Sequence, residues 1–198
     1  MNNNIVYKNV NLKEFTSCKT GGPAKYFIQI DNVDDLINTL DSAKKEGINI
    51  FVLGGGSNVL INDNGFEGLV IKIQNKKLKV VPTMDDYFEI AVGAGWNLNN
   101  LIMELAQQSI SCLEDLYGIP GTVGGSIRGN CGVTNFEIKD VVSKVYNLDW
   151  LRFNDYNFEI KTYNQNECGF GYRESIFKRK ANIIWETNLV GKKCNETI

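Results

Sequence analysis

The segment Asn49-Ile50-Phe51-Val52-Leu53-Gly54-Gly55-Gly56-Ser57-Asn58 joins a strand pattern directly to a run of three glycines. Upstream of it, Tyr26–Ile30 is rich in aromatic and β-branched residues, which predicts another strand. Between the two, Asn32 can cap a helix over residues 33–46, where apolar residues recur at helical spacing. Strand, helix and strand in this order predict a βαβ unit, with parallel strands and a right-handed crossover.

A second group of elements is predicted farther along the chain. Strands are expected near residues 69–73, 77–81, 87–92, 141–148, 157–163 and 182–190, and a helix over residues 97–108. The sequence therefore predicts an α+β fold, in which a small βαβ lobe (residues 1–74) precedes a larger mixed-sheet lobe (residues 75–198).

Composition excludes several classes of protein. The 198 residues include 21 Lys+Arg and 23 Asp+Glu, and this net charge of −2 supplies no basic face for nucleic acid. The sequence has no histidine, which removes imidazole metal sites and histidine-based catalysis. None of the five cysteines forms a CxxC pair, so we expect no metal site and no disulfide framework.

Targeting signals are also missing from the pattern. No apolar run approaches the roughly 18 residues of a membrane span. The start Met1-Asn2-Asn3-Asn4 has neither the charged nor the apolar region of a signal peptide. The sequence therefore predicts a cytoplasmic protein with no membrane partner.

The glycine run at residues 54–56 is the first candidate site. Glycines at the carboxyl end of a strand can turn consecutive backbone N–H groups toward one point, which favours a phosphate or pyrophosphate. Ser57 and Asn58 can add side-chain donors. The segment has no Gly-Lys-Ser/Thr of a P-loop, and Val59-Leu60-Ile61 looks extended, unlike the helix of a Rossmann fingerprint. A plain tight turn is the alternative.

Residues 118–126, Gly-Ile-Pro-Gly-Thr-Val-Gly-Gly-Ser, form the second candidate site. Four glycines within eight residues, beside a proline, indicate a backbone that comes close to a flat or charged group. A loop with so little side-chain bulk suits a large cofactor better than a small metabolite. The alternative is a cluster of turns between core elements.

The third candidate is Phe170-Gly171-Tyr172-Arg173-Glu174-Ser175-Ile176-Phe177. An arginine beside aromatic residues can be held rigid for a carboxylate or a developing enolate. A surface patch of Arg173 and Glu174 is the alternative.

Together, and in this order, these segments make the chain resemble the UDP-N-acetylenolpyruvoylglucosamine reductase family, also called UDP-N-acetylmuramate dehydrogenase, of bacterial peptidoglycan synthesis. The stretches that carry the resemblance are residues 15–24, 53–60, 93–95, 113–125, 129–132, 137–140 and 170–177. The resemblance implies a two-lobed FAD-binding fold of the PCMH/VAO-like type, with the flavin between the lobes. It also implies an FAD-dependent oxidoreductase that uses NADPH to convert UDP-N-acetylglucosamine enolpyruvate to UDP-N-acetylmuramate.

The resemblance also implies roles for individual residues. The implied cofactor-binding residues are Gly54, Gly55, Gly56, Ser57, Asn58, Gly118, Ile119, Pro120, Gly121, Thr122, Gly124 and Gly125. Arg173 matches the catalytic arginine that steadies the substrate carboxylate and the enolate, and Tyr172 and Asn130 are implied substrate-binding residues. In the family reaction, hydride passes from NADPH to FAD and then to the enolpyruvyl double bond, and a protein acid protonates the neighbouring carbon.

The sequence departs from the family pattern in one main respect. Family members normally continue into a third, substrate-binding domain that carries a serine or cysteine proton donor and a catalytic glutamate, and neither motif occurs here. Cys18 also replaces a common phenylalanine, and Thr134-Asn135 replaces an aromatic-glycine pair. The alternative function is therefore a non-catalytic FAD- or nucleotide-binding module, or half of a split enzyme completed by a C-terminal fragment. A structural protein that has lost the cofactor is a third possibility.

Overall fold

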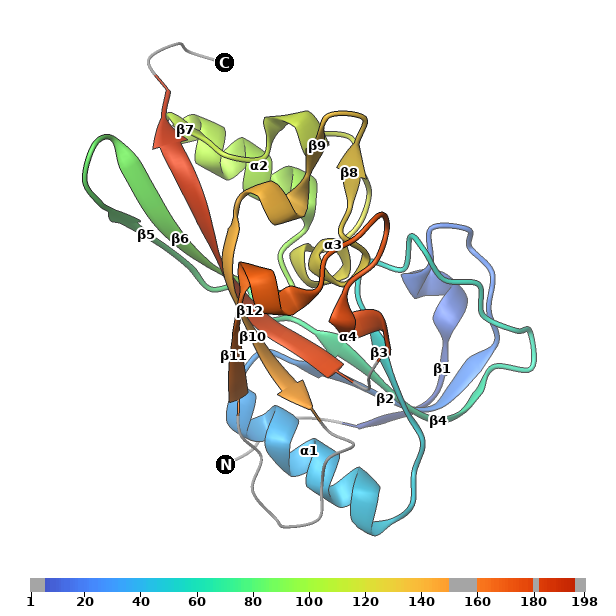
Figure 1. Ribbon diagram of the computed structural model, residues 1–198. Coiled ribbons are helices and arrows are strands. Elements are labelled where there is room, and N and C mark those ends of the chain that lie inside the picture. Colours follow the sequence, from blue (N-terminus) through green and yellow to red (C-terminus); the bar gives the residue numbers. More distant parts are fainter. Residues whose placement is uncertain (1–5, 150–159, 180–181, 195–198) are drawn as a thin grey trace. The chain divides into compact units, whose positions relative to one another are not determined.

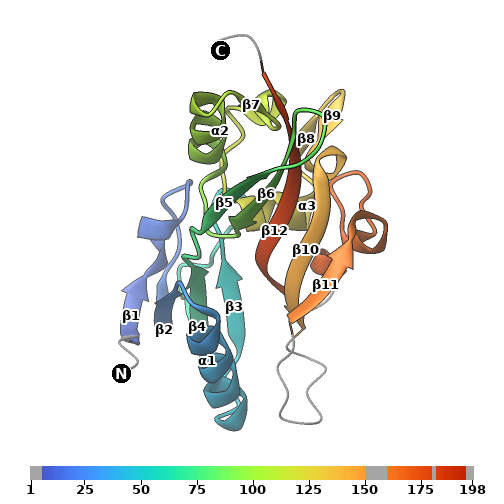
Figure 2. The same ribbon diagram turned by 90° about the vertical axis from the view of Figure 1, so that its left-hand side faces the viewer.

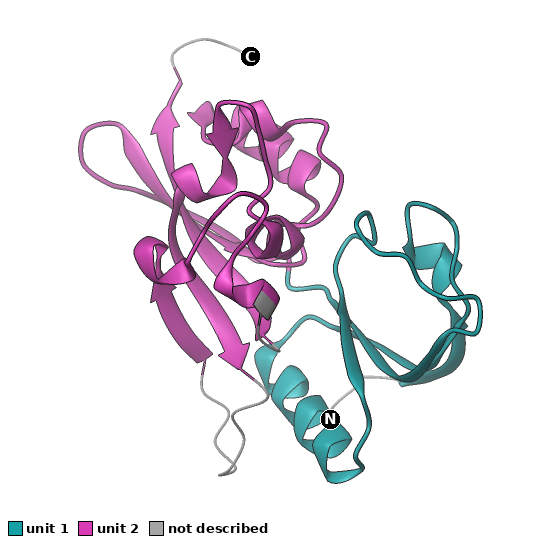
Figure 3. Ribbon diagram, turned by 45° about the vertical axis from the view of Figure 1, so that its right-hand side comes forward, with its two compact units in different colours: residues 1–75 teal, residues 76–198 magenta. Residues whose placement is uncertain are grey.

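The computed structural model describes residues 6–149, 160–179 and 182–194 (Figures 1 and 2). The chain divides into two compact units, Met1–Asn75 and Lys76–Ile198 (Figure 3).

Unit 1 is built on a four-stranded sheet in the order β1-β2-β4-β3. The strands are β1 (Tyr7–Asn11), β2 (Pro23–Ile30), β3 (Ile50–Leu53) and β4 (Phe66–Ile73). Both β2 and β3 pair with β4 in parallel, and β1 pairs with β2 antiparallel. The predicted βαβ strands are therefore parallel, but β4 lies between them.

Helix α1 (Val33–Lys45) connects β2 to β3 and agrees with the helix predicted over residues 33–46. The Asn32 side chain caps its start by accepting a hydrogen bond from the Asp35 N–H at 2.8 Å. Leu36, Leu40 and Ala43 are buried along one face, which packs toward the sheet (Figure 2). Burial of this apolar face fixes the helix on the sheet.

A compact core holds the end of β3 in unit 1. Leu53, the last residue of β3, is fully buried against Leu12, Phe27 and Val70. Phe15 stacks on Phe27 with 4.6 Å between the ring centroids. The glycine run at residues 54–56 therefore begins from a rigid strand end.

Unit 2 contains an antiparallel sheet in the order β11-β10-β12-β6-β5, and β7 pairs with the end of β12 on the side opposite β6. The strands are β5 (Leu78–Pro82), β6 (Tyr87–Gly93), β7 (Ile110–Ser111), β10 (Val142–Asp149), β11 (Ile160–Asn164) and β12 (Asn182–Lys193). Strand β12 extends to Lys193, beyond the predicted end near residue 190. Residues 157–159 of the strand predicted over 157–163 lie outside the described residues.

The remaining elements of unit 2 are short. They are α2 (Leu98–Gln107), α3 (Val123–Gly129), α4 (Ile176–Arg179), the hairpin strands β8 (Gly132–Val133) and β9 (Phe136–Glu137), and 3-10 turns at Glu114–Leu116, Ile138–Asp140 and Gln165–Cys168. The predicted helix over 97–108 corresponds to α2, whose start is capped by Asn97. Helices α3 and α4 lie beside each other and against β12 (Figure 1).

Two sheets with attached helices confirm the predicted α+β class. None of the helices in the described part of the chain combines the length and the apolar character that crossing a bilayer requires.

Candidate functional site

In the loop after β3, the carbonyl groups of Gly54 and Gly56 accept hydrogen bonds from other residues of unit 1. Gly56 has a φ of +71°, and a Cβ added there would lie 1.9 Å from the carbonyl oxygen of Phe15. The Ser17 N–H donates to the Gly56 carbonyl at 3.0 Å, and Lys72 Nζ donates to the Gly54 carbonyl at 2.9 Å. Both the backbone conformation and the close approach of Phe15 therefore require glycine at position 56.

Three N–H groups of the same loop remain available. Those of Gly55, Gly56 and Asn58 donate to no acceptor within the described residues. Successive N–H groups around a left-handed glycine form the concave donor set that binds anions. The N–H groups of Gly55, Gly56 and Asn58 would therefore suit a phosphate group such as those of FAD, and the binding role of residues 54–58 stays a prediction.

The second candidate, residues 118–125, is not one loop. Residues 118–122 are a turn segment, and α3 begins at Val123, where the sequence analysis expected glycine-rich loop. The Thr122 Oγ1 caps this helix by accepting from the Gly125 N–H at 3.3 Å. A Cβ on Gly124 would lie 2.8 Å from the Cβ of Ala94, so Gly124 allows close helix packing.

The turn segment is fixed to the start of α2. The Gly118 N–H donates to Asn99 Oδ1 at 2.7 Å, and Asn99 Nδ2 donates to the Ile119 carbonyl at 3.2 Å. The Gly121 carbonyl accepts from the Leu98 N–H at 3.1 Å. The N–H groups of Gly121 and Thr122 have no acceptor in the part of the chain that the structure describes, so they too are available to an anionic group.

The third candidate forms a tight turn with Tyr172 and Arg173 at its tip. Gly171 and Glu174 exchange two backbone hydrogen bonds of 3.0 and 3.1 Å. Arg173 adopts a φ of +54°, which is uncommon for an arginine. Its Nη2 donates to the Gly132 carbonyl at 2.7 Å, and its Cζ lies 5.9 Å from the Tyr172 ring centroid. The backbone turn and these two contacts give the guanidinium a defined position.

An open cleft of about 780 Å³ lies beside this turn in unit 2. It is lined by residues 132–137, which form the β8–β9 hairpin, by Lys139 and Asp140, and by Tyr172 and Arg173. The sequence analysis singled out Tyr172 and Arg173 but gave no role to the hairpin, Lys139 or Asp140. The Glu137-Ile138-Lys139-Asp140 segment was quoted for the resemblance only, because its contacts to residues 130 and 165 are not visible in a local pattern.

The two cations that line the cleft, Lys139 and Arg173, differ in their contacts. Glu137 and Lys139 form an ion pair, which lowers the pKa of the Glu137 carboxyl and raises the pKa of the Lys139 ammonium. Arg173 donates to a neutral carbonyl instead, and no carboxylate among the described residues forms an ion pair with it. The guanidinium of Arg173 also helps to lower the pKa of Glu137, but it forms no direct ion pair within the described residues, so its remaining donors suit a carboxylate or phosphate ligand.

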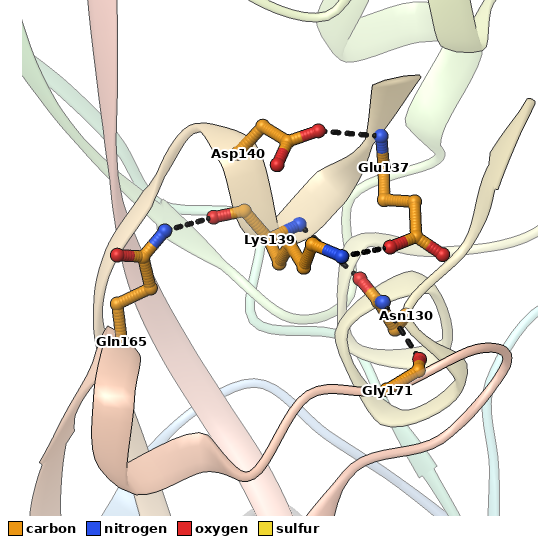
Figure 4. A network of polar contacts seen from close by, with 6 residues as sticks. All are labelled: Asn130, Glu137, Lys139, Asp140, Gln165 and Gly171. Carbon is orange, nitrogen blue, oxygen red and sulfur yellow. Dashed lines mark hydrogen bonds and ion pairs between the residues drawn. The ribbon is translucent and has the colours of Figure 1, made fainter. Parts of the chain in front are cut away.

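A buried amide connects the segments around the cleft (Figure 4). Asn130 is 0% exposed, and its Nδ2 donates to the Gly171 carbonyl at 2.9 Å. Its Oδ1 accepts from the Lys139 N–H at 3.3 Å, and Gln165 Nε2 donates to the Lys139 carbonyl at 2.6 Å. The predicted site residues Asn130, Tyr172 and Arg173 are therefore brought together, and residues 118–125 are not among those that line this cleft.

Further contacts tie α3 to the chain that follows the turn. Ser175 Oγ donates to the Arg128 carbonyl at 2.7 Å, and the Arg128 guanidinium donates to the Phe177 carbonyl. Lys178 Nζ donates to the carbonyl of Arg173 at 2.6 Å. Partial burial lowers the pKa of Arg128. These residues support the position of the turn from its other side.

The cysteines contribute no reactive centre to the cleft. None of the five, all of which lie within the described residues, forms a disulfide bond, and burial raises the pKa of Cys112 and of Cys168 to about 12. Burial also raises the pKa of Cys131, next to the cleft, although Ser126 and Arg173 oppose this shift. A thiol with a raised pKa is a poor nucleophile. No group of three or more His, Cys, Asp or Glu side chains suited to a metal occurs among the described residues.

Comparisons with known proteins identify the family of the chain. The family described as FAD binding domain matches residues 24–150. The chain is 36% identical over 185 residues to the UDP-N-acetylenolpyruvoylglucosamine reductase of Carboxydothermus hydrogenoformans, covering 90% of this chain and 56% of that protein. It is 34% identical over 177 residues to the enzyme of the same name from Thermobifida fusca, covering 89% and 48%. The chain thus spans about half the length of the curated relatives it matches.

Solved structures give the same picture of the fold. The UDP-N-acetylenolpyruvylglucosamine reductase of Thermus caldophilus superposes with a TM-score of 0.73 and 30% identity, over 96% of this chain and 64% of that one. Cholesterol oxidase from Brevibacterium sterolicum reaches a TM-score of 0.73 at 12% identity, over 98% of this chain and 38% of the other, which is a likeness of fold. These matches confirm the predicted FAD-binding fold of the PCMH/VAO-like type. The chain therefore belongs to the FAD binding domain family and is a relative of the UDP-N-acetylenolpyruvoylglucosamine reductases.

Proposed function

We propose that the chain supplies the flavin-binding part and the substrate arginine of a UDP-N-acetylenolpyruvoylglucosamine reductase. In this proposal UDP-N-acetylglucosamine enolpyruvate is reduced to UDP-N-acetylmuramate for peptidoglycan synthesis, with NADPH as the hydride donor. The observation that carries the proposal is the guanidinium of Arg173, which lies at the edge of an open cleft and is fixed by a carbonyl rather than by an ion pair. Support also comes from the relatives of that name, which match along most of the chain.

Phosphate groups of FAD would accept from the main-chain N–H groups of Gly55, Gly56 and Asn58 in unit 1, and the N–H groups of Gly121 and Thr122 in unit 2 would each suit the same kind of group. Of the remaining implied residues, Gly124 acts through the packing of α3, and Gly125 lies in the first turn of that helix. Ile119 and Pro120 would shape the turn between the donor groups. Bound FAD would supply the hydride-transfer chemistry that no side chain in the cleft provides.

Arg173 would bind the substrate carboxylate and stabilise negative charge as the enolate develops. Its position is set before the ligand arrives, by the Gly132 carbonyl and the Tyr172 ring, so little reorganisation is needed. Tyr172 is 86% exposed and would cover the bound ligand. Glu137 is held ionised by Lys139, so this carboxyl would not act as the acid that protonates the substrate carbon.

The proposal is tested with purified protein and FAD, by following the loss of NADPH absorbance when UDP-N-acetylglucosamine enolpyruvate is added. Arg173→Ala should lower turnover by roughly 10²- to 10³-fold without changing FAD affinity. Arg173→Lys is the matched control: it keeps the charge but loses the forked donor geometry, so it should recover only part of the rate. Equal turnover in the wild type and Arg173→Ala would overturn the role of Arg173.

The second candidate function is a non-catalytic FAD- or nucleotide-binding module, or one half of a split enzyme. The fact that favours it is the extent of the match, which covers 56% of one relative and 48% of another. A yellow protein that binds FAD but does not oxidise NADPH would support the module. Turnover restored by a complementary C-terminal fragment would support the split enzyme.

NADPH and a UDP-sugar as reactants favour the cytoplasm as the location of the proposed reaction.

A further inference from the structure

Asn130 occupies an unusual position at the end of α3. It is 0% exposed and has a φ of +43°, a left-handed conformation that asparagine tolerates better than most non-glycine residues. A buried amide in the protein interior needs hydrogen-bond partners for both of its ends. The structure provides partners for both ends, and the Glu137 carboxylate also accepts a hydrogen bond from the Asn130 side chain.

The two ends of the amide contact different segments that border the cleft (Figure 4). Nδ2 donates to the carbonyl of Gly171, the first residue of the Arg173 turn, at 2.9 Å. Oδ1 accepts from the N–H of Lys139, which lines the cleft, at 3.3 Å. An amide can donate and accept at once, and no carboxylate or ammonium of similar size can do both.

A second bond runs in the opposite sense between the same two segments. Arg173 Nη2 donates to the carbonyl of Gly132, two residues after Asn130. Residues 130–132 and 171–173 are therefore joined twice, once through the Asn130 side chain and once through the Arg173 side chain. If the first bond is lost, the second must hold a turn whose arginine is already in an uncommon backbone conformation.

We infer that Asn130 is a positioning residue: its amide holds the Gly171–Glu174 turn so that the Arg173 guanidinium faces the cleft, without contact between Asn130 and substrate. This inference rests on the proposed function, in which Arg173 binds the substrate carboxylate. It gives Asn130 a different role from the direct substrate contact that the resemblance implies.

Two substitutions distinguish the contribution of the Asn130 side-chain amide from that of the left-handed backbone conformation at this position. Asn130→Gly keeps the left-handed conformation and removes the side chain. Asn130→Asp keeps the size and the acceptor for the Lys139 N–H, but an ionised carboxylate cannot donate to the Gly171 carbonyl. A protonated carboxyl can donate again, so falling pH should restore the turn in Asn130→Asp.

The charged groups around position 130 determine where that recovery occurs. Burial and the Gly171 carbonyl favour the protonated carboxyl, as does the Glu137 carboxylate, whereas Lys139 and Arg173 favour the ionised form. Asn135→Asp is the matched control, because Asn135 lines the same cleft but is exposed. Its new carboxyl should titrate near the usual value of ~3.9, so it stays ionised between pH ~8 and pH ~5.5.

Two measurements test the inference on the FAD-bound protein. The first is amide hydrogen exchange at Gly171 and Glu174, compared with the wild type at the same pH. In Asn130→Gly, protection of these two amides should fall about tenfold at pH ~8 and at pH ~5.5. In Asn130→Asp it should fall only at pH ~8. The amides of β12 should stay protected in both variants. The second is the Kd for UDP-N-acetylglucosamine enolpyruvate, which should rise about tenfold under the same conditions and recover in Asn130→Asp at pH ~5.5. Asn135→Asp should show no such recovery.

The outcomes distinguish this inference from the proposed function. Unchanged exchange at Gly171 and Glu174 in Asn130→Gly would overturn the inference, whatever happens to substrate binding. Faster exchange at the turn with an unchanged Kd would also overturn it, because the held turn would then not serve the ligand. If the turn loosens as expected but the wild type binds no substrate, the proposed function fails, and with it the substrate role of the turn.

Discussion

Two independent constraints act on Gly56, the left-handed residue of the first glycine run. Its φ is +71°, and an added Cβ would lie 1.9 Å from the Phe15 carbonyl oxygen. We expect Gly56→Ala to lower the free energy of unfolding by about 3 kcal/mol, since backbone strain and overpacking add. Urea unfolding followed by fluorescence measures this change.

Gly47 provides the matched control for that prediction. It has a similar φ of +64°, but no atom lies within 4 Å of the position of an added Cβ. Gly47→Ala should therefore lower the free energy of unfolding by only about 1 kcal/mol, from backbone strain alone. Equal losses in the two variants would show that the approach of Phe15 does not constrain the loop.

Two of the residues beside the cleft are also left-handed, although neither is glycine. Asn130 and Arg173 have φ values of +43° and +54°. Such conformations cost of order 1–2 kcal/mol each and persist where surrounding contacts fix them. The bonds from Asn130 to Gly171 and from Arg173 to Gly132 are those contacts. Among the described residues, two of the seven non-glycine residues with a positive φ are thus the ones proposed to position the substrate carboxylate.

At the scale of elements, α3 depends on one glycine for packing and tolerates change at the next. A Cβ on Gly124 would lie 2.8 Å from the Ala94 Cβ, whereas a Cβ on Gly125 would meet only Thr122 Oγ1, at 3.5 Å. Gly124→Ala should therefore destabilise the protein by about 1–3 kcal/mol through overpacking. Gly125→Ala should stabilise it by about 0.5–1 kcal/mol, because alanine favours a helix. Thermal unfolding compares the two, and shifts of the same sign would contradict the assigned packing.

The same helix shows where prediction from sequence is limited. Helix α1 was predicted because its cap, Asn32, and its apolar face, Leu36 and Leu40, lie close together in the sequence. Helix α3 was missed because three of its seven residues are glycine, which has low helix propensity. Packing against Ala94 outweighs that propensity, and contact with a residue thirty positions away leaves no local pattern.

Pairing between distant segments was equally hidden. The βαβ pattern predicted parallel strands in unit 1, but it could not show that β4 is inserted between β2 and β3. The cleft was predicted only through Tyr172 and Arg173. Its other wall depends on two hydrogen bonds of the Lys139 backbone, whose N–H donates to Asn130 and whose carbonyl accepts from Gln165, 9 and 26 positions away along the chain. Turns depend on residues that are neighbours in the sequence and can be predicted from it. Strand registers and clefts depend on contacts between distant segments, which a local pattern does not contain.

At the scale of the whole molecule, the proposed FAD donors belong to both compact units. Residues 54–58 are in Met1–Asn75, and residues 118–122 are in Lys76–Ile198. A ligand that binds only the folded state stabilises whatever must be folded to bind it. If both donor sets hold FAD, the cofactor should therefore stabilise both units.

We expect FAD at a roughly 100-fold excess over its Kd to stabilise each unit by about 2.7 kcal/mol. Hydrogen exchange separates the two responses, through the amides of β4 in unit 1 and of β12 in unit 2. Riboflavin is the control, because it has the ring system but no phosphate, and it should protect both strands far less. The N–H groups of Gly55, Gly56 and Asn58 should become protected by FAD but not by riboflavin, since they have no acceptor within the described chain. If FAD protected β12 but not β4, the glycine run of unit 1 would not bind the diphosphate. If riboflavin protected both strands as strongly as FAD, these donors would not recognise the phosphates.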